Sequence, residues 1–183
     1  MDKREYNAAE NRSHDGQIRT RDILHAYAEK YETVDSEYGV NSDFANNTEP
    51  ITATRKHLAA EKKRCGSHNC AQAILCTYAD IIGIDEQMAR NIANSFGAGM
   101  GNMEGTCGAL IGAGITLGMF TKDRLKSMKG MKQMMTQFQQ RNGATQCKLL
   151  KGVGTKVVLR ECPDCVADAA EFLEEQIQNN LEI

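Results

Sequence analysis

The run Gly105-Thr-Cys-Gly-Ala-Leu-Ile-Gly-Ala-Gly-Ile-Thr-Leu-Gly-Met-Phe120 is the longest uncharged stretch of the chain. It is shorter than the roughly 20 residues that an α-helix needs to cross a bilayer, so it predicts a buried core helix. Its small residues form two rows with fourfold spacing: Gly105, Ala109 and Ala113, and Gly108, Gly112 and Thr116. Glycine within a helix costs about 1 kcal/mol relative to alanine. Either close approach by neighbouring helices or room for a bulky group beside Cys107 would compensate for that cost.

Helical patterns continue on both sides of this run. The predicted helices cover Thr52–Arg64, Asn69–Ile82, Asp85–Ser95, Thr106–Phe120, Thr121–Arg141, Thr145–Leu150 and a final helix from Pro163. The final helix carries an apolar stripe formed by Val166, Ala169, Leu173 and Ile177. Only Lys156–Leu159 has a pattern that hints at a strand. The chain is therefore predicted to be all-α, a compact multi-helix bundle.

The composition fits one domain built from small and aliphatic side chains. The chain has 183 residues, of which 41% are hydrophobic and only 5% aromatic, with no Trp. Residues 1–50 are polar and acidic, which predicts a flexible N-terminal extension with one short helix over Thr20–Glu32. Residues 51–183, which contain all seven cysteines, are predicted to form one helical, cysteine-containing domain.

Charge and targeting signals exclude several classes of function. A net charge of −2 gives no electrostatic footprint for nucleic acid. The N-terminus has no apolar signal segment, so we expect a cytoplasmic protein without membrane insertion. No feature identifies a redox partner, a substrate or an enzymatic reaction. The sequence is compatible with a homo-oligomer.

The cysteines carry the clearest chemical signal. The chain has seven, an odd number that argues against a structural disulfide framework in a reducing compartment. Four of them fall at predicted helix starts: Cys70, Cys107, Cys147 and Cys162. The helix dipole and unpaired backbone N–H groups lower the pKa of a thiol there, and the thiolate is both nucleophile and metal ligand. The four thiols are expected to converge on one site, with chance placement as the alternative.

Other motifs are weaker. Cys162-Pro-Asp-Cys165 is a CxxC without the following His of a haem attachment site or the second pair of a zinc finger. The loop with Gly97, Gly99 and Gly101 follows a predicted helix, so it does not fit a dinucleotide fingerprint. Its backbone amides, and that of Gly108, are instead expected to approach a cofactor at the cysteines.

Histidine and methionine give candidates of lower weight. His68, two residues before Cys70, is a possible base or ligand, but a surface loop position is the favoured interpretation. The methionines at helical spacing are expected to fill the core rather than bind copper: Met128, Met131, Met134 and Met135. The lysines between them, such as Lys126 and Lys132, are expected to form a solvated face.

Three segments resemble the C_GCAxxG_C_C family of redox-active proteins: Asn69-Cys-Ala-Gln-Ala-Ile-Leu75, Gly97-Ala-Gly-Met-Gly101 and Thr106-Cys-Gly-Ala-Leu-Ile-Gly112. Cys147-Lys-Leu-Leu and Cys162-Pro-Asp-Cys-Val166 are similar to its two later cysteine segments. The resemblance covers residues 55–180. It implies that Cys70, Cys107, Cys147 and Cys162 are the recurring cysteines, that Cys165 is optional, and that Cys65 and Cys76 lie outside the set. It also implies a redox or electron-transfer role, with an iron–sulfur cluster suspected in related domains.

Three hypotheses follow from these observations. The first is a redox protein that holds a metal centre, an iron–sulfur cluster in the favoured case, through the four cysteines. The second is a metal-free thiol–disulfide redox protein. The third is a non-catalytic helical module whose cysteines bind zinc or simply pack. The first two require the four sulfurs to lie within one site.

Overall fold

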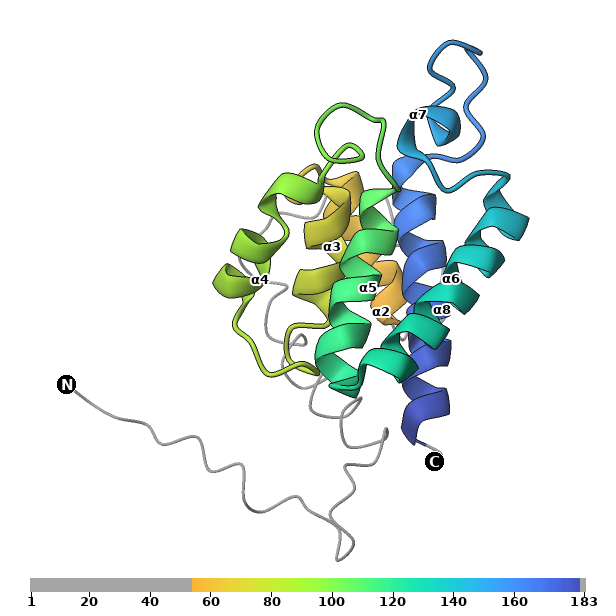
Figure 1. The fold of residues 1–183 in the computed structure, drawn as a ribbon. Coiled ribbons are helices and arrows are strands. Elements are labelled where there is room, and N and C mark those ends of the chain that lie inside the picture. The colour runs from red at the N-terminus through yellow and green to blue at the C-terminus, as the bar shows by residue number, and fades with distance from the viewer. Residues whose placement is uncertain (1–53, 182–183) are drawn as a thin grey trace, which may run out of the picture. The chain divides into compact units, whose positions relative to one another are not determined.

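The computed structural model describes residues 54–181, which form a helical bundle (Figure 1). Seven α-helices and one 3-10 helix occur in this range: α2 (Arg55–Arg64), α3 (Cys70–Thr77), α4 (Glu86–Ile92), η2 (Asn94–Phe96), α5 (Gly108–Thr121), α6 (Arg124–Asn142), α7 (Cys147–Leu150) and α8 (Cys162–Leu181). Residues 54–181 contain no strand, only one isolated bridge between Thr106 and Gln146. The all-α prediction is confirmed, and the strand hinted at for Lys156–Leu159 is wrong.

The uncharged run forms α5, which packs against α3, α6 and α8. Its glycines permit this contact, because a Cβ on Gly112 would lie 2.7 Å from the Ala71 carbonyl oxygen of α3. A Cβ on Gly108 would lie 2.4 Å from the Phe96 carbonyl oxygen. Close approach by neighbouring backbone therefore accounts for both glycines.

The longest helix, α8, supplies much of the remaining core. Its predicted stripe of Val166, Ala169, Leu173 and Ile177 is buried as expected. It packs against α2 and α5, so residues from both ends of the described chain lie side by side (Figure 1). A smaller apolar cluster lies between α3 and α4 and includes Leu75, Cys76 and Ala89.

Helix boundaries differ from prediction where local hydrogen bonding ends a helix early. The predicted helix Asn69–Ile82 ends at Thr77, and the turn after it closes with the Ile84 amide donating to the Ala79 carbonyl. Lys122 adopts φ +51° between α5 and α6, and the Asp123 carboxylate then accepts from the first amides of α6. Thr121 therefore belongs to α5, not to the following helix.

The methionines divide between core and surface. Met134 is fully buried, and Met131 and Met135 pack at the edge of the core, as predicted. Met128 is 60% exposed, so its prediction as core filler is wrong; it lies on the lysine-rich outer face of α6. Lys126 and Lys132 are exposed, as expected for a solvated face.

The predicted extension over residues 1–50 and its helix Thr20–Glu32 lie outside the described residues, so both stay predictions. Between residues 54 and 181, every helix is too short or too polar to cross a membrane.

Candidate functional site

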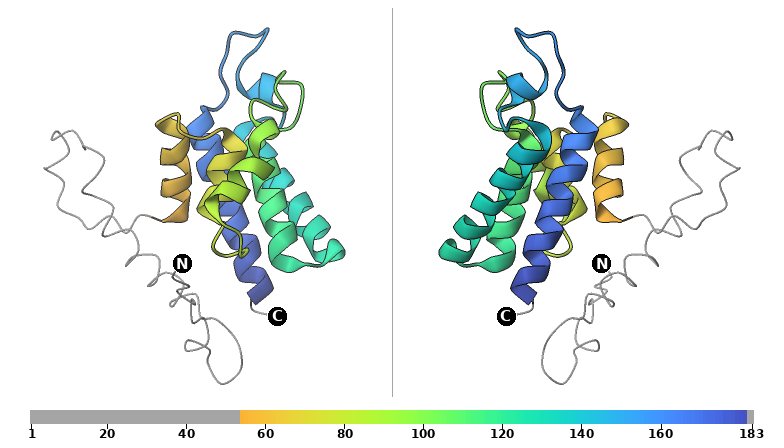
Figure 2. Two further views of the ribbon diagram at one scale, coloured as in Figure 1. Left: turned by 90° about the vertical axis from the view of Figure 1, so that its left-hand side faces the viewer. Right: turned by 90° about the vertical axis from the view of Figure 1, so that its right-hand side faces the viewer.

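The four cysteines at predicted helix starts lie at one end of the bundle. Cys70, Cys147 and Cys162 are the first residues of α3, α7 and α8, and Cys107 is the N-cap of α5. The starts of these helices gather at the same end in all three ribbon views (Figures 1 and 2). Cys70, Cys107 and Cys147 are buried and Cys162 is half-buried.

Backbone hydrogen bonds fix the starts of α5 and α7 to each other. The Cys107 amide donates to the Thr145 carbonyl at 2.8 Å, and the Cys147 amide donates to the Gly105 carbonyl at 3.0 Å. This pair of bonds surrounds the isolated bridge between Thr106 and Gln146. Two cysteines 40 residues apart in sequence are thereby held next to each other by main chain, the most rigid attachment that a loop offers.

The start of α3 is held by a capping box at Asn69. Its side-chain oxygen accepts from the Gln72 amide at 2.9 Å, and the Gln72 side chain accepts from the Asn69 amide at 3.0 Å. The side-chain NH₂ group of Asn69 (Nδ2) also donates to the Ala93 carbonyl at 3.0 Å, which joins α3 to the segment before η2. The capping box therefore sets the position of Cys70, the next residue.

Cys70 and Cys162 form a thiol pair with their sulfurs 3.8 Å apart. The hydrogen bond from the Cys70 thiol lowers the pKa of Cys162 to about 5, and the Lys151 ammonium adds to this effect. The same bond, together with burial, raises the pKa of Cys70 far above its usual range. The pKa of Lys151 changes as well. Burial lowers this pKa, but the bond to Cys162 raises it, and the net shift is upward. Cys162 is therefore the thiolate of this pair and Cys70 the thiol.

Cys165 belongs to the same group of thiols, although the family resemblance made it only an optional member. It is buried one turn after Cys162 on α8, and its thiol donates to the Arg160 carbonyl at 3.9 Å. The neighbouring Cys165 thiol lowers the pKa of Cys107, and the Cys107 thiol, together with burial, raises the pKa of Cys165. The signal in the sequence was the CxxC spacing, because residues three apart share one face of a helix.

Cys147 completes the thiol cluster, which we define as Cys70, Cys107, Cys147, Cys162 and Cys165. Burial raises the pKa of Cys147, and the nearby charges of Cys107 and Cys162 raise it further. The prediction that every helix-start thiol has a lowered pKa is therefore wrong for Cys70 and Cys147. At these two positions burial and neighbouring thiols outweigh the helix dipole.

The predicted glycines pack against the cysteine-bearing segments. A Cβ on Gly99 would lie 2.6 Å from the Cys147 Cβ, and one on Gly108 would lie 3.2 Å from the Cys70 Cβ. A Cβ on Gly97 would meet the Asn69 side chain at 2.8 Å. Gly101, at φ +87°, meets nothing within 4 Å. Gly99 and Gly108 thus let the chain pack directly against Cys147 and Cys70, Gly97 packs against Asn69, and the role of these glycines toward a cofactor stays a prediction.

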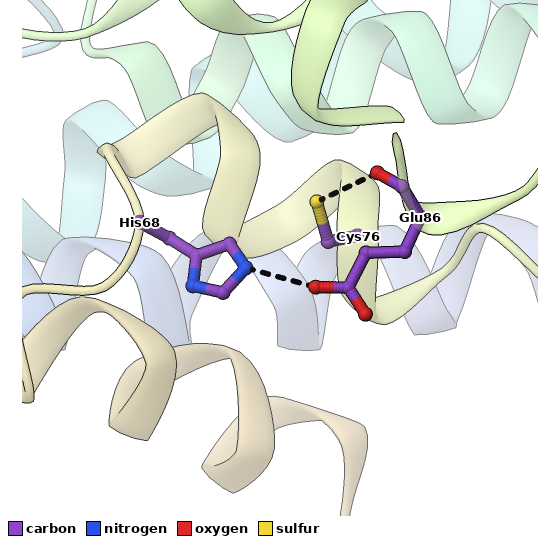
Figure 3. Close-up of side chains that lie close together, drawn as sticks. All are labelled: His68, Cys76 and Glu86. Atoms are coloured by element: carbon purple, nitrogen blue, oxygen red, sulfur yellow. Dashed lines mark hydrogen bonds and ion pairs between the residues drawn. The ribbon is translucent and has the colours of Figure 1, made fainter. Parts of the chain in front are cut away.

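A second group of side chains lies outside the thiol cluster. His68, Cys76 and Glu86 offer three ligand atoms within 4.8 Å of one another, enough to hold a metal ion (Figure 3). His68 is only 6% exposed, so its interpretation as a surface loop residue is wrong. Burial lowers its pKa, and Lys62 and Arg90 add to that effect. Cys65, in contrast, is exposed and bonds Ser67.

The two groups differ in geometry. Across residues 54–181, the triad of His68, Cys76 and Glu86 is the only set of three such side chains whose ligand atoms all approach within 4.8 Å. The thiol cluster instead contains a close sulfur pair with further thiols around it. This arrangement leaves more space between its sulfurs than a single tetrahedral ion requires.

Comparison with known proteins agrees with the cysteine pattern. The sequence model of a family described as "Putative redox-active protein (C_GCAxxG_C_C)" matches residues 68–176, more than half of the chain. The matched range contains every cysteine of the thiol cluster. No curated protein and no solved structure matches the chain significantly.

Proposed function

Because this chain belongs to the C_GCAxxG_C_C family of redox-active proteins, we propose that the thiol cluster is its redox centre and transfers electrons. In this proposal Cys70, Cys107, Cys147 and Cys162 hold an iron–sulfur cluster. Cys165, whose neighbouring thiol lowers the pKa of Cys107, supports the site.

The observation that carries the proposal is the 3.8 Å separation of the Cys70 and Cys162 sulfurs within a group of five thiols. Two thiolates on one tetrahedral metal ion, with metal–sulfur bonds of about 2.3 Å, lie about 3.8 Å apart. The remaining cysteines are too distant to share that same ion. A centre with more than one iron would use both the close pair and the more distant thiols, and four cysteine thiolates are the usual ligands of such clusters.

Electrostatics around the thiols also favours a bound anionic centre. Helix starts offer partial positive charge, and Lys151 adds a full charge beside Cys162. Cys107 and Cys162 have lowered pKa values, which suits them as thiolate ligands near neutral pH. Burial of Cys70, Cys107 and Cys147 keeps water from their sulfurs, whereas Cys162 is half-buried. An iron–sulfur cluster bound there would supply one-electron transfer.

A metal-free thiol–disulfide reaction is the second candidate, favoured by the same sulfur pair. The Cys162 thiolate and the Cys70 thiol would form a disulfide by giving two electrons to an external disulfide and one proton to solvent. The sulfurs would have to move from 3.8 Å to about 2.05 Å, the length of a disulfide bond. The half-buried position of Cys162 gives an external disulfide access to it.

The proposal is tested by purifying the full chain anaerobically and measuring iron, acid-labile sulfide, zinc and visible absorption. We expect iron and sulfide with absorption above 400 nm in the unchanged chain. Cys107→Ser should lose at least nine-tenths of the iron, because a hydroxyl is a poor ligand for it. Cys65→Ser is the matched control, since Cys65 is an exposed cysteine outside the cluster, and it should keep its iron.

Other results would contradict the iron–sulfur centre. A chain without iron in which two thiols are lost on mild oxidation would support the thiol–disulfide reaction instead. Zinc without iron that is lost in Cys107→Ser would indicate a non-catalytic zinc-binding module, because zinc at a site outside the thiol cluster would survive this substitution. Equal iron loss from Cys107→Ser and Cys65→Ser would show that the thiol cluster is not the ligand set.

A further inference from the structure

We propose that His68, Cys76 and Glu86 bind Zn²⁺ at a site separate from the thiol cluster. His68 lies in the loop before α3, Cys76 lies in the last turns of α3, and Glu86 is the first residue of α4. Figure 3 shows the imidazole and the carboxylate facing each other, with the Cys76 sulfur beside them. Nitrogen, sulfur and carboxylate oxygen are the donor types that zinc takes in proteins.

The distance between His68 and Glu86 fits a shared ion better than a strong hydrogen bond. His68 Nε2 lies 3.4 Å from Glu86 Oε1, whereas N–H···O bonds are most often about 2.9–3.0 Å long. Two ligands at about 2.0–2.1 Å on a tetrahedral zinc ion lie about 3.3 Å apart. All three ligand atoms already lie within 4.8 Å of one another.

One tautomer of His68 suits the zinc site. In that tautomer His68 Nδ1 carries the proton and donates to the Ser67 hydroxyl oxygen, 2.7 Å away, while the Ser67 hydroxyl donates to the Lys62 carbonyl at 3.2 Å. Nε2 of the neutral ring then has a lone pair that faces the Glu86 carboxylate. A cation between these two acceptors removes their repulsion, and a second N–H bond of this kind is typical of zinc-binding histidines.

The donors of this site differ in exposure. The side chain of His68 is 4% exposed and that of Glu86 is 52% exposed, so the buried donors are reached from the solvent side of Glu86. Glu86 Oε1, which faces His68 Nε2, also accepts from Arg90, and among the described residues no hydrogen bond reaches Glu86 Oε2. Three protein ligands leave one zinc position for water, the pattern of open zinc sites.

The weak bond of Cys76 is consistent with this role. Its sulfur lies 3.9 Å from the Glu86 carbonyl oxygen, a long contact for a thiol donor. Burial raises the pKa of Cys76 to about 11 in the metal-free state. Zinc binding would release the thiol proton to solvent, so each bound ion frees one proton from this residue.

The test uses Co²⁺ as a spectroscopic probe for zinc in the full, metal-free chain under anaerobic conditions. We expect the number of Co²⁺ ions bound per chain to fall by one in Cys76→Ala. Glu86→Gln should weaken that one site at least tenfold, and its exposed position keeps the fold intact. Arg90→Gln is the matched control, because it removes the same ion pair without removing a ligand, and it should bind Co²⁺ at least as tightly as the unchanged chain.

Failure of this site and failure of the iron–sulfur centre are distinguishable. Cys107→Ser should lose iron and keep the Co²⁺ site, whereas Cys76→Ala should lose the Co²⁺ site and keep iron. Unchanged stoichiometry and affinity in Cys76→Ala and Glu86→Gln would overturn the zinc proposal. Equal weakening by Glu86→Gln and Arg90→Gln would also overturn it, because the carboxylate would then act through the ion pair rather than as a ligand.

Discussion

Each cysteine of this chain behaves according to its immediate neighbours as much as its place on a helix. Cys162 and Cys107 have lowered pKa values because each lies beside another thiol, Cys70 and Cys165 respectively. Cys70 and Cys147 also lie at helix starts, yet burial and nearby thiols raise their pKa values. The helix dipole acts over the first turn only, and a second thiol at hydrogen-bonding distance has the larger effect.

Cys162 should be the first thiol to react as the pH rises. Its pKa of about 5 predicts that iodoacetamide alkylation, followed by mass spectrometry, reaches half its maximal rate near pH 5 in the metal-free chain. Lys151→Met should move this midpoint to higher pH, since the Lys151 ammonium stabilises the thiolate. Lys148→Met is the control, because Lys148 pairs with Glu104. A midpoint near the ordinary thiol value in the unchanged chain would contradict the assignment.

The same shift has a consequence for stability. Between pH 5 and pH 9 the native Cys162 binds fewer protons than it does in the unfolded chain, whose thiol has a pKa near 9.0. The free energy of unfolding therefore gains from this group as pH rises through that range. This contribution to the free energy of unfolding is complete above pH 9, the pKa of the unfolded thiol, and is lost as the pH falls through about 5.

At the scale of the helix, the glycines of α5 serve different purposes. Gly112 allows α3 to approach, because an added Cβ would lie 2.7 Å from the Ala71 carbonyl oxygen and 3.1 Å from the Ile74 Cβ. Gly118, on the same helix, has nothing within 4 Å of an added Cβ. One position is therefore fixed by packing, whereas the other carries only the intrinsic cost of glycine in a helix.

These two glycines give a matched pair of substitutions. Gly112→Ala should lower the free energy of unfolding by about 1–3 kcal/mol, because backbone must move to admit the methyl group. Gly118→Ala should raise it by about 0.5–1 kcal/mol, the propensity gain of alanine over glycine. Urea denaturation followed by circular dichroism at 222 nm measures both. Effects of the same sign would show that α3 and α5 are not in the close contact described here.

Across the whole molecule, Asp168 joins three segments at the end of the bundle that carries the cysteines. It is 4% exposed on α8 and accepts from Arg141 of α6 at 3.1 Å and from Arg160 at 3.0 Å. Arg160 lies in the loop before α8, and its backbone carbonyl also accepts a hydrogen bond from the Cys165 thiol at 3.9 Å. Asp168 thereby positions the loop that leads into Cys162.

Replacing Asp168 should affect both fold and site. Asp168→Asn should lower the free energy of unfolding by about 1–3 kcal/mol, since two partly exposed arginines lose a buried carboxylate partner. Chemical denaturation measures this change, and Glu61→Gln is the control because its pair with Arg64 is exposed and worth little. We also expect faster alkylation of Cys165 as the loop loosens. Equal stability changes in the two variants would contradict the role given to Asp168.

The sequence by itself determined the helical class, the buried run that became α5, and the four helix-start cysteines. These features follow from local periodicity, caps and glycine spacing, which act over a few neighbouring residues. The end of α3 at Thr77 and the exposure of Met128 were predicted wrongly, since turns and packing partners that decide them are not encoded in a local pattern.

Only the tertiary structure decided which thiols are partners. The sulfurs of Cys70 and Cys162 approach within 3.8 Å although 92 residues separate them, and the Cys165 thiol lowers the pKa of Cys107, 58 residues away in sequence. The burial of His68 beside Glu86 was likewise hidden, because it depends on how α4 packs against α3. A pKa or a metal site depends on distances of a few ångströms between remote segments. Those distances are set by the packing of whole helices and not by the residues that adjoin each side chain in sequence.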